Sequence, residues 1–358
     1  MSATAGTSAG DVTQAELRLA ARNHGMPLEA LRYPITPVGL HYLLVHYDIP
    51  AVDPGAWRLG VDGAVERALA LSLADLRGLP AVTRAVTLEC AGNGRALLEP
   101  RPVSQPWLSE AVGTAEWTGV RLAQLLDEAG VGDGAVEVVF TGLDRGVEGG
   151  VEQLYERSLT VDDAMRDDVL LAYACNGGPL PPQHGFPLRL LVPGWYGMTS
   201  VKWLTRIAFT DEPFTGYQMV TGYRMRAGED DAGTPVTRIE PRSLLAPPGI
   251  PDFMTRRRFL TPGRHRLEGR AWSGWAPIEE VDISTDGGET WQPASLGSPP
   301  GPAAWAPFAL DWDATEGEHV LCSRARDASG RSQPAAPPWN VGGYANNALQ
   351  RIPVTVRA

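Results

Sequence analysis

Cys90 ends an alternating stretch and directly precedes a turn of small residues. Apolar and polar residues alternate over 86–90, the period-2 pattern of a strand with one buried face. Residues 91–94, Ala-Gly-Asn-Gly, accept positive φ, so a sharp turn is expected after the thiol. The thiolate is the reactive form of cysteine, and Arg95 or a metal would favour it. The pattern predicts a metal ligand or a nucleophile at Cys90; an inert buried thiol is the commoner alternative.

A second group of reactive side chains lies further along the chain. Two cations, an imidazole and a hydroxyl fall in one short stretch: His184, Arg189, Ser200 and Lys202. Arginine makes bidentate contacts to phosphate and lysine makes point-charge contacts. The group therefore favours an anion-binding site. Taken alone, these residues could equally be solvated strand charges and a turn histidine.

The ligand types around Cys90 do not complete a protein-only metal site. A thiolate suits a soft or high-valent transition metal, and a structural zinc site needs about four protein ligands. The sequence near Cys90 offers no CxxC, HExxH or HxH partner. If Cys90 binds a metal, the other ligands must come from a cofactor, which would then carry the chemistry.

Residues 87–95, T-L-E-C-A-G-N-G-R, carry a family resemblance. They resemble the T-L-x-C-A-G-N-x-R segment of the sulfite oxidase family of molybdenum–pterin enzymes, and other segments match in order from about residue 36 to the C-terminus. The resemblance implies that Cys90 is the protein's sulfur ligand to molybdenum. It implies a pocket around the metal formed by Cys90, Arg95, Trp107 and Tyr173.

The resemblance also implies a molybdopterin cofactor and a fold. In the family, an H-G-F-P-x-R segment and a later V-K-W segment hold the pterin and its phosphate. The implied cofactor-binding residues are Tyr42, His46, Cys90, Asp144, His184, Arg189, Ser200, Val201 and Lys202. The implied fold is α+β: a mixed α/β molybdopterin-binding domain followed by an immunoglobulin-like β-sandwich that commonly forms a homodimer.

Two departures from the family pattern concern the substrate. On the register that the flanking sequence sets, His46 takes the place of the pterin-side histidine, and Leu44 stands where the family has an arginine. Pro302 lies in a second segment where an arginine is expected. A dianionic oxyanion needs cationic clamps, so both departures favour a less charged substrate unless Arg22 or Arg101 compensates.

Length and composition agree with a two-domain enzyme. The chain has 358 residues, a net charge of −11, 40 Gly and 31 Pro, which suggest two domains with many loops and strands. The negative charge argues against binding to nucleic acid or an anionic membrane. Its three cysteines are far apart and predict no disulfide. No apolar run is long enough for a membrane span, and no signal or twin-arginine peptide is found.

The pattern along the chain predicts how these residues are positioned. We expect a flexible tail over 1–20 that includes a short helix from residue 14, a catalytic domain over 21–235 and a dimerisation domain over 236–358. An aromatic-rich strand is expected over 36–50. Acidic, glycine-containing residues 228–234 are the best linker candidate. Short strands with regular Asp/Gly turns after about residue 236 predict the sandwich.

The predicted activity is two-electron oxygen-atom transfer at molybdenum, with electrons passed to an external acceptor such as a cytochrome. Sulfite is one substrate hypothesis, a sulfoxide or other S- or N-oxide is another, and a non-catalytic interaction module is a third. No haem is expected, because there is no CxxCH motif. A cytoplasmic location is expected, or a periplasmic one if a leader has been trimmed from this chain.

Overall fold

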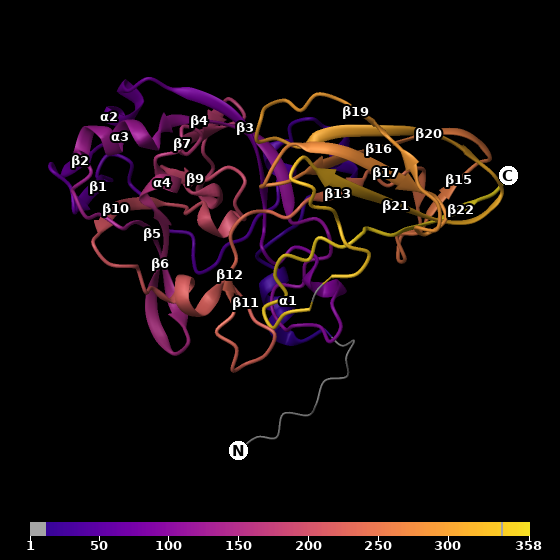
Figure 1. Ribbon diagram of the computed structural model, residues 1–358, viewed down its shortest axis with the longest axis horizontal. Helices are drawn as coiled ribbons and strands as arrows, with labels where there is room; N and C mark the ends of the chain where they lie inside the picture. The colour runs from indigo at the N-terminus through magenta and orange to yellow at the C-terminus, as the bar shows by residue number, and fades with distance from the viewer. Residues whose placement is uncertain (1–11, 338) are drawn as a thin grey trace, which may run out of the picture.

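An α/β part and a β-sandwich lie side by side along the long axis of the molecule (Figure 1). The computed structural model describes residues 12–337 and 339–358. Among the helices of these residues, none combines the length and the apolar character needed to cross a membrane. The first part runs from indigo to salmon in Figure 1, and the sandwich is orange to yellow.

One sheet of the first part has the strand order β2-β1-β10-β5-β6. Its strands are β1 (Leu59–Gly63), β2 (Leu69–Leu71), β5 (Glu137–Glu148), β6 (Val151–Thr160) and β10 (Leu204–Thr210). β1 and β10 are parallel, and most of the first part lies between them in the chain. Such a pair needs a long crossover, which here consists of most of the first part.

The second sheet carries the cysteine strand. Its strands are β3 (Val82–Glu89), β4 (Val112–Arg121), β7 (Leu170–Cys175) and β8 (Gly178–Pro179), with β9 (Arg189–Leu191) paired to β7. The last five residues of β3 are all buried, although the sequence alternates. The second face is covered by the sandwich part, where the Trp305 amide donates to Thr87 Oγ1 at 2.8 Å.

Short helices cover these sheets. They are α1 (Gln14–Ala20), α2 (Leu73–Gly78), α3 (Leu122–Ala129), α4 (Val161–Ala164), the 3-10 helices η1 (Leu28–Arg32), η2 (Val38–Leu40), η3 (Arg95–Leu97), η4 (Pro182–His184) and η5 (Gly197–Thr199), and the π-helix η6 (Gln218–Gly222). α3 buries Leu122, Leu125 and Leu126, the spacing of one helical face. α2 begins with a capping box between Ser72 and Asp75. Both signals, the cap and the leucine spacing, are present in the sequence.

The sandwich consists of two sheets with the orders β13-β16-β20-β19 and β14-β15-β22-β21-β17-β18. The strands are β13 (Arg242–Leu245), β14 (Ile250–Pro251), β15 (Arg258–Leu260), β16 (Gly263–Trp272), β17 (Ile278–Ser284), β18 (Gln292–Pro293), β19 (Ser295–Leu296), β20 (Ala306–Ala314), β21 (Gly317–Asp327) and β22 (Ile352–Val356). Leu267, Val281, Leu321 and Val354 lie in the core between the sheets. The sandwich of short strands that the sequence predicted after about residue 236 is confirmed.

The two parts share buried contacts. Trp272 and Trp305, from the sandwich sequence, belong to the core of the first part, with ring centroids 6.2 Å apart. β13, the first sandwich strand, begins at residue 242. The limits of 21–235 and 236–358 therefore remain predictions about the chain, since packing alone does not separate the parts at a single residue.

The predicted strand over residues 36–50 is wrong. This segment contains η2 and otherwise runs irregularly, with one isolated bridge between His24 and Leu43. Its carbonyl groups are bound by side chains instead of a neighbouring strand: Lys202 donates to Leu44, and Arg22 donates to residues 45, 46 and 47. The backbone is therefore satisfied without a sheet.

Two further predictions need correction. Part of the predicted flexible tail, residues 1–11, lies outside the described residues, and Gln14–Ala20 forms the capped helix α1, whose Glu16 is fully buried. The predicted linker over 228–234 is the loop of a hairpin between β11 (Arg224–Met225) and β12 (Thr234–Pro235). It is held by Arg224, which donates to the carbonyl groups of Ala232 and Gly233.

Candidate functional site

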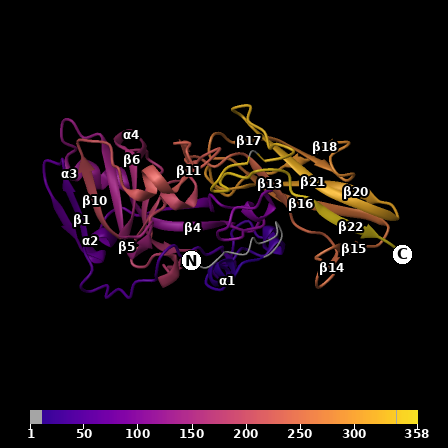
Figure 2. The ribbon, with the colours of Figure 1, turned by 90° about the horizontal axis from the view of Figure 1, so that it is seen from below.

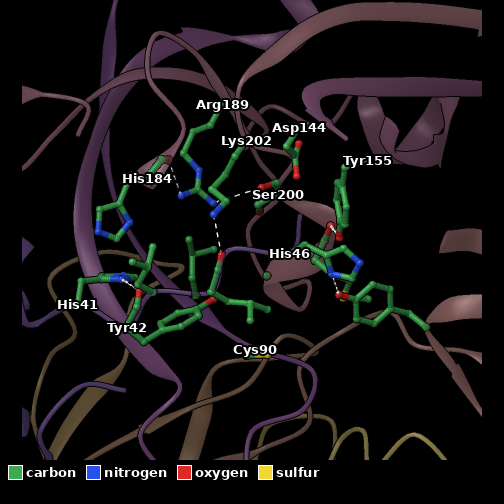
Figure 3. Close-up of a pocket in the computed structure, with 16 residues that line it drawn as sticks. His41, Tyr42, His46, Cys90, Asp144, Tyr155, His184, Arg189, Ser200 and Lys202 are labelled. Atoms are coloured by element: carbon green, nitrogen blue, oxygen red, sulfur yellow. Dashed lines mark hydrogen bonds between the residues drawn. The ribbon is translucent and has the colours of Figure 1, made fainter. Parts of the chain in front are cut away.

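A cavity opens beside the end of β3 (Figure 3). Its walls come from the irregular segment 41–46, from β3, β5 and β6, and from the stretch between η4 and Lys202. The lining residues are His41, Tyr42, Leu43, Leu44, His46, Leu88, Cys90, Asp144, Tyr155, His184, Arg189, Gly197, Met198, Ser200, Lys202 and Tyr223. Figure 3 shows Cys90 on the side of the cavity opposite Arg189 and Lys202.

Arg189 and Lys202 form the cationic side of the cavity. Arg189 is 5% exposed and donates to the carbonyl groups of His184 at 3.1 Å and Ser200 at 3.2 Å. Its guanidinium lies 4.8 Å above the Trp117 ring. Burial lowers the pKa of Arg189 to about 10, which leaves it charged at neutral pH. The fold thus maintains a buried cation that faces the cavity.

Lys202 lies beside Asp144. Its Nζ donates to the Leu44 carbonyl at 2.6 Å, and burial together with the Arg189 charge lowers its pKa. Burial raises the pKa of Asp144, and the charges of Lys202 and His46 oppose this shift. Oδ1 of Asp144 is buried and has no hydrogen-bond partner among the described residues. This carboxyl therefore has an acceptor position open toward a ligand.

His41 and His184 line the same cavity, with ring centroids 5.6 Å apart. His41 Nδ1 lies 3.0 Å from the Tyr42 carbonyl, which favours the tautomer with a proton on that nitrogen. Burial lowers the pKa of His41 to about 4 and that of His184 to about 2. Both rings are neutral at pH 7 and can therefore donate or accept hydrogen bonds without adding charge.

These two histidines give the cofactor-free protein a pH-dependent stability. Unfolding exposes imidazoles with an ordinary pKa of 6.5, so the unfolded chain binds more protons than the folded one between pH 6.5 and 4. Stability is therefore lost as the pH falls through this window. His41→Asn is expected to reduce the slope of unfolding free energy, from urea titrations, by about 1.4 kcal/mol per pH unit. His265→Asn, far away in the sandwich, is the control; an unchanged slope in His41→Asn would contradict the assignment.

Cys90 lines the other side of the cavity, and Arg95 lies close to it but is not a lining residue. Burial raises the pKa of the Cys90 thiol, and the Arg95 charge, the Gly92 amide and the Trp107 indole act against this shift. Arg95 is 5% exposed and donates to the carbonyl groups of Gly342 at 2.8 Å and Gln105 at 3.1 Å. A Cβ on Gly92 would lie 2.6 Å from Arg95 Cζ, so glycine is needed for this close approach.

Tyr223, which the sequence analysis missed, lines the cavity, and Tyr173 does not. Tyr173 packs into the larger core, with Arg77 5.6 Å from its ring centroid. Its neighbour on β7, Ala172, belongs to the core cluster of Cys90, and successive residues of a strand face opposite sides. The expected position of Tyr173 beside the metal is therefore corrected.

Tyr223 is 8% exposed and directly follows η6. Its hydroxyl lies 3.5 Å from His46 Nδ1, and Arg157 lies 5.6 Å from its ring centroid. His46 Nε2 in turn lies 3.0 Å from Glu148 Oε2. The Tyr223 hydroxyl is thereby connected through His46 to a partly exposed carboxylate. In the sequence, Tyr223 could have been recognised by its position in a polar, irregular stretch just after the strand that contains Phe209.

The remaining candidate residues divide between the cavity and its supports. Tyr42 lines the cavity and stacks on His41 at 5.2 Å. Ser200 also lines it, and its Oγ accepts from the Val192 amide at 3.2 Å. Val201 does not line the cavity; it belongs to the core beneath. Trp107 is buried in the same core cluster as Cys90, its indole acts on the thiol, and it does not line the cavity.

None of the proposed substitutes for the missing arginines lines the cavity. Arg22 binds backbone carbonyl groups behind Leu44, and Arg101 pairs with Glu16. Leu44 itself is a lining residue. Residues 301–305, which include Pro302, pack against β3, where the Thr87 amide donates to the Ala303 carbonyl at 2.9 Å. Of the expected cations on the substrate side, Arg95 lies close enough to Cys90 to act on its thiol, although it does not line the cavity either.

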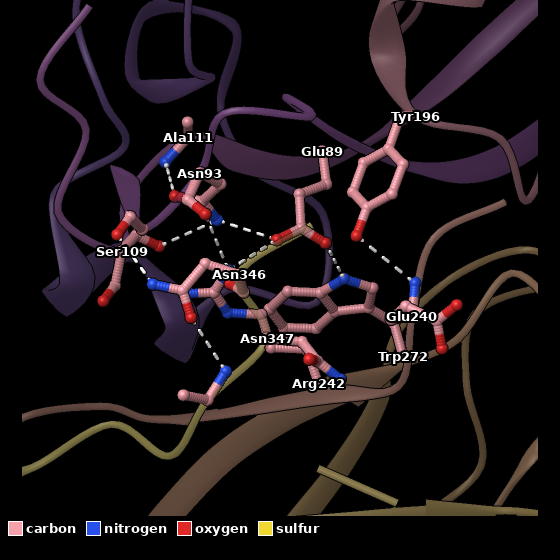
Figure 4. Close-up of polar contacts among 12 residues, drawn as sticks. Glu89, Asn93, Ser109, Ala111, Tyr196, Glu240, Arg242, Trp272, Asn346 and Asn347 are labelled. Atoms are coloured by element: carbon pink, nitrogen blue, oxygen red, sulfur yellow. Dashed lines mark hydrogen bonds and ion pairs between the residues drawn. The ribbon is translucent and has the colours of Figure 1, made fainter. Parts of the chain in front are cut away.

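The carboxylate of Glu89 connects the cysteine strand to the sandwich (Figure 4). Glu89 is 2% exposed and accepts from Arg242 at 2.8 Å, from the Trp272 indole at 2.7 Å and from Asn93 at 2.9 Å. Asn346 donates to the Gly94 carbonyl at 2.7 Å. The turn that follows Cys90 is therefore held by strands β13 and β16 and by the C-terminal segment.

Two parts of the chain match families of known domains. Residues 46–218 match the oxidoreductase molybdopterin binding domain, and residues 251–357 match the Mo-co oxidoreductase dimerisation domain. The fold and the site thus define an oxidoreductase of the molybdopterin-binding class, and the second match supports a homodimer.

Comparison with individual relatives shows to which family within this class the chain belongs. Sulfite oxidase from Gallus gallus is 37% identical over 337 residues, which cover 88% of this chain and 72% of that protein. Nitrate reductase [NAD(P)H] from Hordeum vulgare is 33% identical, and the match covers 90% of this chain and 39% of that protein. The crystal structure of the sulfane dehydrogenase SoxCD from Paracoccus pantotrophus superposes with a TM-score of 0.80, at 29% identity, over 93% of this chain and 86% of that chain. The chain belongs to the sulfite oxidase family.

The residues of the cavity fit a molybdenum–molybdopterin group. The buried thiol of Cys90 is a suitable soft ligand, and the opposite side provides cations and hydrogen-bonding groups for an anionic pterin. Three buried polar atoms of the lining residues have no partner among the described residues: His41 Nε2, Asp144 Oδ1 and Arg189 Nε. Buried polar groups are ordinarily paired, so these atoms indicate a polar ligand.

Proposed function

We propose that this oxidoreductase oxidises sulfite, or a similar sulfur oxyanion, by two-electron oxygen-atom transfer and passes the electrons to an external acceptor. The observation that carries the proposal is Arg95, a buried cation close to Cys90, just outside the residues that line the cavity, with two of its donors fixed by carbonyl groups. An oxyanion on this side of the cavity would be attracted by that charge. The names of the relatives, sulfite oxidase and sulfane dehydrogenase, support sulfur chemistry.

In this proposal the chain's own residues bind and orient. Cys90 is the sulfur ligand, and Asp144, His184, Arg189, Ser200 and Lys202 hold the cofactor, with Tyr42, His41 and His46 around it. The bound molybdenum–pterin group supplies the two-electron redox chemistry. Arg95 attracts the substrate toward the thiol by its charge, and Trp107 packs beside the thiol behind the lining residues.

Tyr223 takes the role that the sequence analysis gave to Tyr173. Its hydroxyl can donate to a substrate oxygen in the cavity and exchange its proton with His46 Nδ1, 3.5 Å away. Glu148, 3.0 Å from the other nitrogen of His46, keeps that ring oriented and stabilises it when it is protonated.

Tyr223→Phe is expected to lower kcat about 100-fold, because a hydrogen bond to a developing charge in a buried site is lost. The measurement is steady-state turnover by molybdenum-loaded protein. Tyr173→Phe is the matched control and should retain the activity of the wild type. A large loss of kcat in Tyr173→Phe, with kcat retained in Tyr223→Phe, would assign the role to Tyr173 instead.

The substrate itself is tested by sulfite-dependent reduction of an artificial electron acceptor, with protein verified to contain molybdenum. Saturable turnover that requires Arg95, seen as a higher KM in Arg95→Met, would support a sulfur oxyanion. Absence of turnover in the metal-loaded protein would overturn the proposal that the substrate is sulfite or a similar sulfur oxyanion.

A second candidate is an oxotransferase acting on a less charged S- or N-oxide. Leu44 favours it, because an apolar side chain lines the cavity where a cation was expected. The same loaded protein, assayed with a neutral sulfoxide and a reduced donor dye, distinguishes the two candidates.

A further inference from the structure

The buried arginines of the described residues fall into two groups. They are Arg95, Arg157, Arg189, Arg242 and Arg258. Arg242 is paired with Glu89 at 2.8 Å, and Arg258 is paired with Glu29 at 3.2 Å. The other three donate to main-chain carbonyl groups, and none of them forms an ion pair with a carboxylate of the described residues. A buried charge without a counter-charge is costly, so a ligand is expected to supply the negative charge.

The unpaired arginines lie around the cavity. Arg189 lines it, and Arg95 lies close to Cys90. In the proposed function Arg189 holds the cofactor and Arg95 attracts the substrate. Arg157 has the same character, a buried charge without a carboxylate, and its role is the one that is left to assign.

Arg157 lies on β6, behind the wall of the cavity. It is 2% exposed, and Tyr155, two residues earlier on the same face of the strand, lines the cavity. Figure 2 shows β6 beside η6, the short helix that leads through Tyr223 into β11. Nη1 of Arg157 donates to the Gln218 carbonyl in η6, and its Nε has no hydrogen-bond partner among the described residues. The guanidinium is thus fixed beside the segment that carries Tyr223.

The charge of Arg157 faces tyrosine rings. Its Cζ lies 5.6 Å from the ring centroid of Tyr223. The centroids of Tyr223 and Tyr344 are 5.3 Å apart, and Cζ of Arg95 lies 5.3 Å from the ring centroid of Tyr344. Two buried cations therefore flank a pair of tyrosines. A nearby positive charge stabilises negative charge on a phenol oxygen, so it makes the hydroxyl a stronger hydrogen-bond donor.

We propose that Arg157 determines the specificity of the cavity for anions, because its charge strengthens the Tyr223 hydroxyl as a donor to a negatively charged substrate oxygen. This inference rests on the proposed function, in which Tyr223 donates to the substrate. Leu44 lines the cavity where a cation was expected, and in this arrangement a cation lies behind Tyr223 instead. A neutral S- or N-oxide would gain less from the same donor, because its oxygen carries only a partial charge.

The test compares two ligands of similar shape, the dianion sulfate and the neutral dimethyl sulfone. Their binding to molybdenum-loaded protein is measured by titration calorimetry, without an electron acceptor. Arg157→Gln removes the charge but keeps an amide that can donate to the Gln218 carbonyl. It is expected to weaken sulfate binding about 10-fold and dimethyl sulfone binding by less than about 2-fold, because a charge-assisted hydrogen bond becomes an ordinary one.

A double variant shows whether Arg157 acts through Tyr223. Tyr223→Phe alone should lose at least as much sulfate affinity, and the addition of Arg157→Gln should then cause no further loss. Arg206→Gln is the matched control for the change in net charge. Arg206 lies on β10, pairs with Asp62 at 2.7 Å and has a side chain that is 53% exposed. Its charge is solvated and screened, so sulfate affinity should be unchanged.

Several results would overturn the role of Arg157. They are wild-type sulfate affinity in Arg157→Gln, equal losses for sulfate and dimethyl sulfone, a further loss in the double variant, and a wild type that does not prefer sulfate. A circular dichroism spectrum checks the fold of each variant. If Arg157→Gln does not fold, Tyr223→Phe decides, since a retained preference for sulfate would contradict the role. Failure of the proposed activity differs from all of these: the wild type would prefer sulfate and show no turnover with sulfite.

Discussion

Replacing Cys90 with serine is expected to abolish turnover while the protein stays folded. The hydroxyl of serine is a harder and less acidic ligand than the thiol, so the proposed soft contact to molybdenum would be lost. Loss of an outer hydrogen-bond partner of a metal ligand already costs 10–100-fold, so loss of the ligand itself should cost more than about 100-fold. The measurements are turnover per bound molybdenum and the unfolding transition.

Cys322→Ser is the matched control for this experiment. Cys322 is also fully buried, but it lies on β21 of the sandwich, far from the cavity. Equal losses in both variants would mean that the cysteine substitution damages folding in general. Full activity in Cys90→Ser would remove Cys90 from the site.

Replacing Glu89 with alanine is expected to destabilise the protein by about 3–5 kcal/mol, because Arg242 would be left buried without its carboxylate. The side chains of Glu89 and Arg242 are 2% and 3% exposed, and the Nη1 of Arg242 donates to both Glu89 and the Asn346 carbonyl. The Trp272 indole would lose its acceptor as well. The measurement is unfolding free energy in denaturant.

Combining Glu89→Ala with Arg242→Met in one protein measures the coupling free energy between the two side chains. Because the double variant leaves no unpaired charge, its loss should be clearly smaller than the sum of the single losses. Glu268→Ala removes a carboxylate from an exposed ion pair with Arg266 and should change stability by less than about 1 kcal/mol. Additive losses in Glu89 and Arg242 would mean that the two side chains are not coupled.

Local patterns in the sequence were sufficient for much of the site. The strand before Cys90, the turn after it and the stretch from His184 to Lys202 are local features, and the fold brings them to one cavity. Helices α2 and α3 follow from a capping box and from apolar spacing, which are also local. The short strands of the sandwich were visible for the same reason.

Features that depend on distant partners were not visible in the sequence. Residues 36–50 have the composition of a strand, but their carbonyl groups are bound by Arg22 and Lys202, which no local pattern reveals. The sequence does not show which of Tyr173 and Tyr223 reaches the cavity. That depends on which side of β7 Tyr173 faces and on where the chain runs after η6. In the sequence, Glu89 is one of the polar residues of an alternating stretch, and nothing local shows that its partners lie on the sandwich.

The contacts of the turn after Cys90 determine when the site can form during synthesis. Gly94 is bound by Asn346, 252 residues further along the chain, and the Ala91 carbonyl accepts from the Ala345 amide. A ribosome has therefore to release the chain at least as far as Asn346 before these contacts can be made. Molybdenum insertion would then be a late step, restricted to chains that have already folded both parts, and a chain that stops early would not retain the metal.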